Sequence, residues 1–289
     1  MKKTITMRKT VLLLITVCLI LGLLPISAQT ADYGTITFRA TSGDTLTESM
    51  VNEQLSAAGV GGPDTFSAEF DSSVMHIGDY AFYYRSGLTS AVIPGSVKSI
   101  GDYAFNYCPG LTDVVIPDSI SSIGDYTFAV SGLINVVIPD SVKSIGKGAF
   151  WMCTNLTDVV IPNSVEDIFG GAFYNCISLT SVDIPGSVTN IGEIAFSMCS
   201  SLTEINVSIA NSAYSSYDGM LFNKNQTMLH TCPAGKSGVC TILGSVSFIS
   251  AYAFSGCYKL TAFDVISANS NYSSHEGVLY NKNQTTLII

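Results

Sequence analysis

The feature that most constrains the fold is a repeat of 22 or 23 residues that runs through the middle of the chain. A phenylalanine, a leucine and an Ile-Pro dipeptide each recur at this interval. Three interlocked series with one period do not arise by chance, and short periods are typical of solenoid proteins. A unit this short cannot bury its own apolar residues, so it must stack on its neighbours. The repeated phenylalanines are Phe82, Phe105, Phe128, Phe150, Phe173 and Phe196.

Each unit begins with a strand pattern, shown here for the unit that starts at Leu111. Leu111, Val114 and Ile116 are candidate inward positions, whereas Asp113 and Val115 point the other way. Alternation with period two over a β-branched stretch indicates a short strand. The proline that follows Ile116 lacks the donor that a continuing strand needs, so it ends the strand.

The rest of the unit predicts a second short extended piece and a turn. Ile120 and Ile123 continue the apolar core, and Gly124 allows a bend. Residues 125–128 fit a single helical turn that buries Phe128. Because a fully buried large apolar side chain contributes roughly 1.5–3 kcal/mol, five or six such residues per unit are enough to hold the stack together.

The complete pattern, Leu-x-x-Val-x-Ile-Pro-x-x-Val-x-x-Ile-Gly-x-x-Ala-Phe-x-x-Cys, resembles the BspA-like (Treponema pallidum-type) leucine-rich repeats of bacterial and some protist surface proteins. The match extends from about Val74 to the C-terminus. The resemblance implies a β-rich leucine-rich-repeat solenoid with short helical turns, in which parallel strands stack coil on coil. It also implies a surface location and adhesive or protein-binding roles rather than catalysis.

The first 28 residues predict a signal peptide. Basic residues precede an apolar run from Val11 to Leu24, and a small-residue stretch follows up to Ala28. The run is shorter than the roughly twenty residues that a spanning helix needs. We therefore expect a secreted or cell-surface protein with no transmembrane segment once the signal peptide has been removed.

Residues 29–62 predict a small α/β cap at the N-terminal end of the solenoid. Residues 34–40 alternate as a strand, and residues 44–58 resemble an amphipathic helix with Thr45 and Glu48 at the spacing of a capping box. Without a cap, the first coil would expose its apolar end.

Tandem repeats of 22–23 residues occupy residues 63–205, and a longer unit with a 58-residue period occupies residues 206–289. Asp218-Gly219 and the Asn-Lys-Asn sequence at 223–225 are typical of turns around an inserted hairpin. The second long unit is expected to be incomplete, since the chain reaches Ile289 before the unit is finished.

Composition excludes two classes of protein. The formal net charge of −9 argues against nucleic-acid binding, because a phosphate-binding face needs clustered Lys and Arg. The hydrophobic content of 47% is too high for an intrinsically disordered chain.

No set of residues in the sequence points to catalysis, a metal or a cofactor, so we expect a protein that is not an enzyme. The three histidines are scattered, and a catalytic nucleophile needs a base beside it. The less favoured alternative is a hydrolase with an unrecognised site near Asp218, Asn223 and His230. The acidic residues at one repeat position fit a solvated row of charges, with a calcium-binding ladder as the alternative. That row contains Asp79, Asp102, Asp125 and Glu193.

The cysteines fall into two groups. Five lie three residues after a repeat phenylalanine, where a small buried residue is the favoured interpretation and a disulfide or metal stack the alternative. Cys232 and Cys240 stand outside this ladder and are candidates for a local disulfide. The five ladder members are Cys108, Cys153, Cys176, Cys199 and Cys257.

The outward strand positions carry the candidate binding residues. Four valines form one row beside a row of polar and acidic residues, a pattern that can mark an interaction face or reflect β-propensity alone. A tyrosine row forms a second surface ladder suited to protein contact. We expect these residues to bind a protein or glycan at a cell surface, with a structural module of a larger surface protein as the alternative. The candidates are Val92, Val115, Val137 and Val160, then Asp113, Asn135 and Asp158, and finally Tyr80, Tyr103 and Tyr126.

Overall fold

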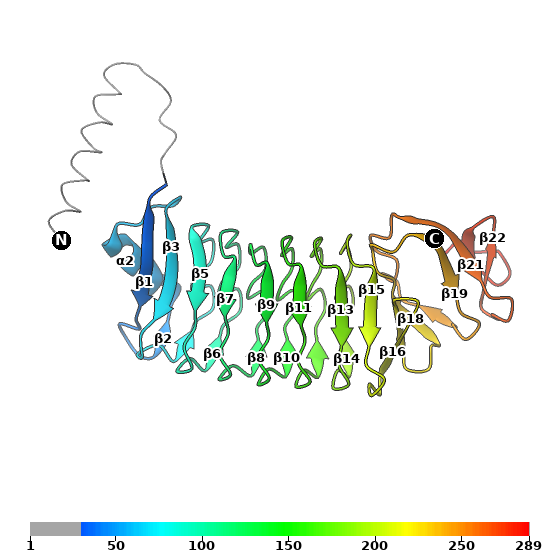
Figure 1. The fold of residues 1–289 in the computed structure, drawn as a ribbon, viewed down its shortest axis with the longest axis horizontal. Coiled ribbons are helices and arrows are strands. Elements are labelled where there is room, and N and C mark those ends of the chain that lie inside the picture. Colours follow the sequence, from blue (N-terminus) through cyan, green and yellow to red (C-terminus); the bar gives the residue numbers. More distant parts are fainter. Residues whose placement is uncertain (1–29, 289) are drawn as a thin grey trace, which may run out of the picture. The chain divides into compact units, whose positions relative to one another are not determined.

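Two columns of parallel strands form the body of the protein in the computed structural model, which describes residues 30–288 (Figure 1). The predicted signal peptide lies outside the described residues. Residues 32–288 form a β-solenoid of about nine turns with very little helix. The predicted leucine-rich-repeat solenoid with parallel stacked strands is therefore confirmed.

The first column contains the longer strand of each coil, and Figure 1 shows these strands side by side. They are β1 (Asp32–Phe38), β3 (Thr65–Phe70), β5 (Leu88–Val92), β7 (Asp113–Val115), β9 (Asn135–Val137), β11 (Asp158–Val160), β13 (Ser181–Ile184) and β15 (Glu204–Val207).

The second column contains two-residue strands from the other side of each coil. They are β2 (Thr45–Leu46), β4 (His76–Ile77), β6 (Ser99–Ile100), β8 (Ser122–Ile123), β10 (Ser144–Ile145), β12 (Asp167–Ile168) and β14 (Asn190–Ile191).

Residues that pair on neighbouring strands are separated by one sequence repeat. Val92 pairs with Val115, and Ile145 pairs with Ile168. Equivalent side chains therefore stand in straight rows along the solenoid. The same register carries the outward residues, so it also arranges the candidate binding surface.

The core is built around a stack of the repeat phenylalanines. From Phe82 to Phe196, consecutive rings lie nearly parallel, with centroids 5.1–5.6 Å apart. Leu111, Ile116 and Ile123 are buried beside this stack, as the alternating pattern predicts. Each ring between Phe82 and Phe196 thus stacks on the rings of the coils before and after its own, which explains why one unit cannot fold alone.

The expected helical turn over residues 125–128 is wrong. Tyr126 and Val130 have φ values of 52° and 56°, which lie in the left-handed region. The amide of Phe128 donates to the carbonyl of Ala149 at 2.9 Å, and the amide of Tyr126 donates to Lys147 at 2.8 Å. These two backbone amides therefore bond to the next coil. In a helical turn they would bond within their own coil instead.

The N-terminal helix is shorter than expected. Helix α2 (Glu48–Ala58) begins after Thr47, whose hydroxyl accepts the amide of Met50 at 3.4 Å. The predicted capping box of Thr45 and Glu48 is wrong, because Thr45 is paired with His76 in β2 and β4. The cap over residues 29–62 stays a prediction; its strands β1 and β2 continue the two columns.

The longer C-terminal units contain the hairpin that the turn sequences predict. β16 pairs with β17 in antiparallel register across Asp218-Gly219, and β22 pairs with β23 in the same way. The strands of this region are β16 (Tyr214–Tyr217), β17 (Met220–Asn223), β18 (Met228–Thr231), β19 (Gly238–Ile242), β20 (Phe248–Ile249), β21 (Leu260–Val265), β22 (Tyr272–His275) and β23 (Val278–Asn281).

A buried asparagine joins each hairpin to the coil before it. The side-chain amide of Asn211 donates to the carbonyls of Pro185 and Val188 at 2.7 and 2.9 Å. Its side-chain oxygen accepts the amides of Ala213 and Tyr214. Asn269 makes the equivalent contacts one long unit later. Because the side chain satisfies four backbone groups, a buried polar residue is tolerated here.

The phenylalanine stack predicts a large effect of Phe128→Ala on stability. We expect a loss of about 3–5 kcal/mol in the free energy of unfolding, because the change leaves a cavity between two rings. Val137→Ala, at an outward position that is 70% exposed, is the matched control and should stay within about 0.5 kcal/mol. Urea denaturation monitored by circular dichroism measures both. A loss below about 1 kcal/mol for Phe128→Ala, within the range of surface changes, would contradict its role in the core.

Candidate binding face

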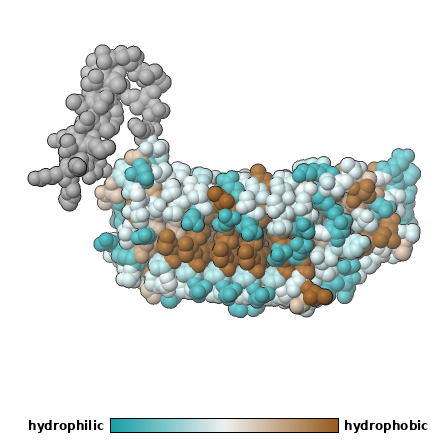
Figure 2. Space-filling model, in the orientation of Figure 1, coloured by the Kyte–Doolittle hydropathy of each residue, from teal (hydrophilic) through white to brown (hydrophobic). Residues whose placement is uncertain are grey.

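The four outward valines form one exposed row across β5, β7, β9 and β11. Their exposed fractions are 47% for Val92, 49% for Val115, 70% for Val137 and 57% for Val160. Figure 2 shows a continuous hydrophobic band on the strand face in this view. The alternation that buries Val114 and its equivalents leaves these valines in solvent, as the sequence predicts.

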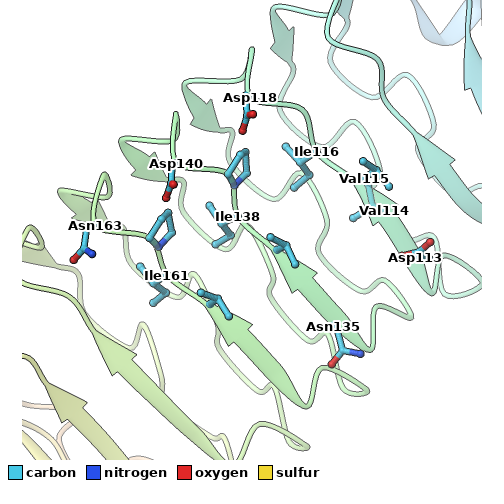
Figure 3. Close-up of a pocket in the computed structure, with 14 residues that line it drawn as sticks. Asp113, Val114, Val115, Ile116, Asp118, Asn135, Ile138, Asp140, Ile161 and Asn163 are labelled. Carbon is cyan, nitrogen blue, oxygen red and sulfur yellow. The ribbon is translucent and has the colours of Figure 1, made fainter.

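The central part of this row lies in a groove of about 780 Å³. Val115, Val137 and Val160 come from three successive coils and line it together. Figure 3 shows Asp113 and Asn135 at one edge of this groove. Of the predicted residues, Val92 and Asp158 belong to the same rows but do not line the groove.

A second acidic edge, made of residues that are not among those predicted from the sequence, borders the other side of the groove. Asp118, Asp140 and Asn163 stand in a row on the turns that follow β7, β9 and β11 (Figure 3). Each follows the proline of an Ile-Pro dipeptide, and that fixed position is the signal that identifies the row. The groove lining contains three carboxylates and no Lys, Arg or His.

Acidic residues end the valine row at both ends. Glu69 pairs with Val92 before the row begins. The next coil beyond Val160 has Asp183 at this position, and Asp183 accepts the side-chain amide of Asn206 at 3.1 Å. The exposed apolar surface is thus a strip that spans four strands and is bordered by acidic residues.

The predicted tyrosine row is a separate surface. Tyr80 and Tyr103 stack with centroids 4.9 Å apart, and Tyr103 and Tyr126 stack at 5.0 Å. Burial, followed by the neighbouring tyrosines, raises the pKa of Tyr103. None of the three lines the valine groove. The structure therefore divides the predicted binding residues between two surfaces.

The acidic ladder has a structural role at three of its positions. Asp79 Oδ1 accepts the amide of Asp102 at 2.9 Å, Asp102 accepts that of Asp125 at 2.7 Å, and Asp125 accepts that of Lys147 at 2.7 Å. Each carboxylate thus joins its coil to the next. Within residues 30–288, no group of three or more His, Cys, Asp and Glu side chains is placed to hold a metal ion.

The cysteine ladder also joins neighbouring coils. The thiol of Cys108 donates to the carbonyl of Phe82 at 3.1 Å, and the thiols of Cys176 and Cys199 make the equivalent bond at 3.2 and 3.1 Å. Burial raises the pKa of Cys108 and Cys199 to about 12 and that of Cys153 to about 11. These contacts support the interpretation as small buried residues for these four cysteines, whereas Cys257 is only partly buried.

The second cysteine group consists of thiols in contact. Cys232 and Cys240 are buried, and the thiol of Cys240 donates to the sulfur of Met220 at 3.6 Å. The neighbouring Cys232 side chain lowers the pKa of Cys240, whereas the pKa of Cys232 is raised by the side chains of Cys240 and Cys257 and by burial. All cysteines that the structure describes are free thiols. The Cys232–Cys240 disulfide stays a prediction.

The three residues near which a hydrolase site was the less favoured alternative make contacts that stabilise the local structure. His230 Nδ1 lies 2.8 Å from the hydroxyl of Thr231 and Nε2 lies 3.0 Å from the carbonyl of Ile191, and burial lowers the pKa of the ring. Asp218 forms an ion pair with Lys236 at 2.9 Å. The side-chain oxygen of Asn223 accepts two backbone amides within its own hairpin. Each of the three thus has a role in its local turn or strand.

The repeat geometry agrees with a family comparison. Residues 75–203 and 122–228, together more than half of the chain, match the family described as the BspA type leucine rich repeat region, with six copies. The chain belongs to the BspA-type leucine-rich repeat family. Proteins with this repeat and fold are generally non-enzymatic.

Solved structures of bacterial proteins have the same fold. A leucine rich cell surface protein from Faecalibacterium prausnitzii is 28% identical with a TM-score of 0.64, over 80% of this chain and 68% of that one. The pneumococcal vaccine antigen PcpA is 22% identical with a TM-score of 0.64, over 85% and 57%. A leucine-rich repeat protein from Eubacterium ventriosum is 24% identical with a TM-score of 0.50, over 82% and 54%.

No curated protein matches the chain. In the part of the chain that the structure describes, no helix has both the length and the apolar character needed to cross a membrane.

The buried thiols of the cysteine ladder predict resistance to alkylation. Burial keeps Cys108, Cys153, Cys176 and Cys199 protonated well above the ordinary thiol range, and only the thiolate reacts. We expect iodoacetamide at pH 8 to leave these four unmodified in the folded protein and to modify all of them in urea. Peptide mass spectrometry measures the difference. Rapid modification of Cys108 or Cys199 in the folded protein would show that the ladder is open to solvent.

The same thiols predict a loss of stability at alkaline pH. Their pKa values are raised on folding, so their contribution is complete below the ordinary thiol pKa of about 8.5 and falls as the pH rises towards 12. The free energy of unfolding should therefore decrease between pH 8 and pH 10. The decrease should be smaller in Cys108→Ala/Cys199→Ala, where two of the titrating groups are absent. An equal decrease in the variant would contradict this assignment.

Proposed function

We propose that this protein acts at the cell surface as a binding module, and that the valine row engages a partner protein. The single observation that carries the proposal is the groove in which three exposed valines lie between two acidic edges. Large exposed apolar patches with polar rims mark interaction sites on soluble proteins. The likeness to a cell surface protein of F. prausnitzii supports export and display outside the cell.

The charge of the groove defines the chemistry of the partner. Its lining carries Asp113, Asp118 and Asp140 without a basic side chain, and the whole chain has a net charge of −9. A complementary partner presents apolar side chains flanked by Lys or Arg. The carboxylates then attract the partner and orient it, since electrostatic complementarity mainly determines the association rate and specificity.

The solenoid provides affinity because it repeats the same valine contact on a rigid support. Equivalent valines are held in register by β-pairing, so the partner meets a preformed row and little ordering entropy is lost on binding. Each valine that is covered adds a modest apolar contribution. This arrangement suits adhesion to a protein of a host matrix.

The double variant Val115→Asp/Val137→Asp tests the face directly. We expect the full chain to bind at least one of immobilised collagen, laminin and fibronectin, and the variant to bind at least about a hundredfold more weakly, because two apolar contacts are lost. Biolayer interferometry measures the affinities, and circular dichroism checks the fold. Ile209→Asp, at an apolar position that is 97% exposed and outside the groove, is the matched control. Unchanged binding by the double variant, or no binding to any of the three proteins, would contradict the proposal.

Salt dependence tests the acidic edges independently of the valines. Raising ionic strength from about 0.01 M to about 1 M shortens the Debye length from about 30 Å to about 3 Å and should slow association. Asp118→Asn/Asp140→Asn should reduce this salt dependence, because it neutralises one edge without removing the valines. An association rate that does not change with salt would show that the carboxylates play no part.

A further inference from the structure

An aromatic column on the turns of the solenoid ends in an open recess. Trp151 and Tyr174 stack with centroids 4.0 Å apart and an interplanar angle of 18°. Each lies one residue after a repeat phenylalanine, whereas the predicted tyrosine row lies two residues before it, so that row does not include them. Trp151 fits closely over Gly171, where an added Cβ would lie 2.8 Å from the indole ring. The glycine therefore allows the stack to form.

The column stops at Tyr174. The next coil has the small, buried Ser197 at the equivalent position, so no ring continues the stack there. The coil beyond it follows directly, because the amide of Met198 donates to the carbonyl of Ser255 at 3.4 Å. That coil presents Tyr252, which is 53% exposed. The missing ring thus leaves a gap between two tyrosines.

The gap is a recess of about 410 Å³, within the range of small-ligand sites of roughly 300–1,000 Å³. Trp151, Tyr174 and Tyr252 line it together with Lys147, Glu193 and the hydroxyl-bearing Ser255. Within residues 30–288, neither Lys147 nor Glu193 forms an ion pair. Donors and acceptors are therefore available beside the rings.

The geometry points to a carbohydrate site: we propose that this recess binds a neutral pyranose saccharide. A pyranose has an apolar ring face that packs on an aromatic ring and a polar edge of hydroxyls that bond to groups of either charge. Both kinds of group occur here on one recess. Lys147 disfavours a cationic ligand and Glu193 disfavours an anionic one, whereas a neutral polyol can use both.

This site is independent of the proposed protein-binding face. No residue of the recess lines the valine groove. Its aromatic residues come from the turns, whereas the valines come from the strand column. Failure of either proposal therefore leaves the other standing.

The chain carries its own reporter for the test, since Trp151 is its single tryptophan and lies in the recess. We would titrate the full chain with cellotetraose, xylotetraose, maltotetraose and chitotetraose while recording tryptophan fluorescence. At least one saccharide should change the emission to saturation. Tyr252→Ala should weaken that binding by about tenfold, the upper end of the contribution of one ring contact. Tyr252→Phe, which keeps the ring, should retain most of the affinity.

Tyr258→Ala is the matched control, because Tyr258 is 83% exposed and does not line the recess. It should bind the saccharide like the unaltered chain, and thermal unfolding should show all variants folded. Absence of any saturable change with all four saccharides up to about 10 mM would overturn the proposal. Equal binding by Tyr252→Ala would also overturn it. A response to tetramethylammonium without a response to any saccharide would identify a cation-binding cage instead.

Discussion

Backbone hydrogen bonding between successive coils is the constraint on which the rest of the structure depends. The amide of Phe105 donates to the carbonyl of Thr127 at 2.8 Å, and that of Phe150 donates to Ala172 at 2.8 Å. These bonds fix one register for the turns as well as for the strands. The phenylalanine stack, the aspartate ladder and the thiol ladder follow from that register, and so do the outward rows that form the candidate binding face.

The parts of the fold that are predictable from the sequence are those with a strict period. The repeat pattern identifies Leu111, Ile116 and Phe128 as buried and Val115 as exposed, and the structure confirms these assignments. The local conformation of the turns is not predictable in the same way. Tyr126 adopts a left-handed conformation because its amide bonds to the next coil, and residue preference alone favours a helical turn.

The binding face could be predicted in part for the same reason. Alternation along a single strand identifies the outward valine of each unit, and the repeat then places these valines in one row. The second acidic edge at Asp118 and Asp140 depends on the path of the turn after the proline. The recess between Tyr174 and Tyr252 depends on two coils that an inserted hairpin separates in the sequence. Residues brought together in this way can be identified only in the folded chain.

Amide hydrogen exchange of the full chain tests most directly whether the coils are joined in one register. The amides of Phe105, Phe128 and Phe150 bond to the following coil, so they should exchange far more slowly than amides of an unfolded chain. Protection should recur at each of these positions with the period of the repeat. Exchange of these three amides at the rate of an unfolded chain would contradict a stacked solenoid held together by bonds between coils.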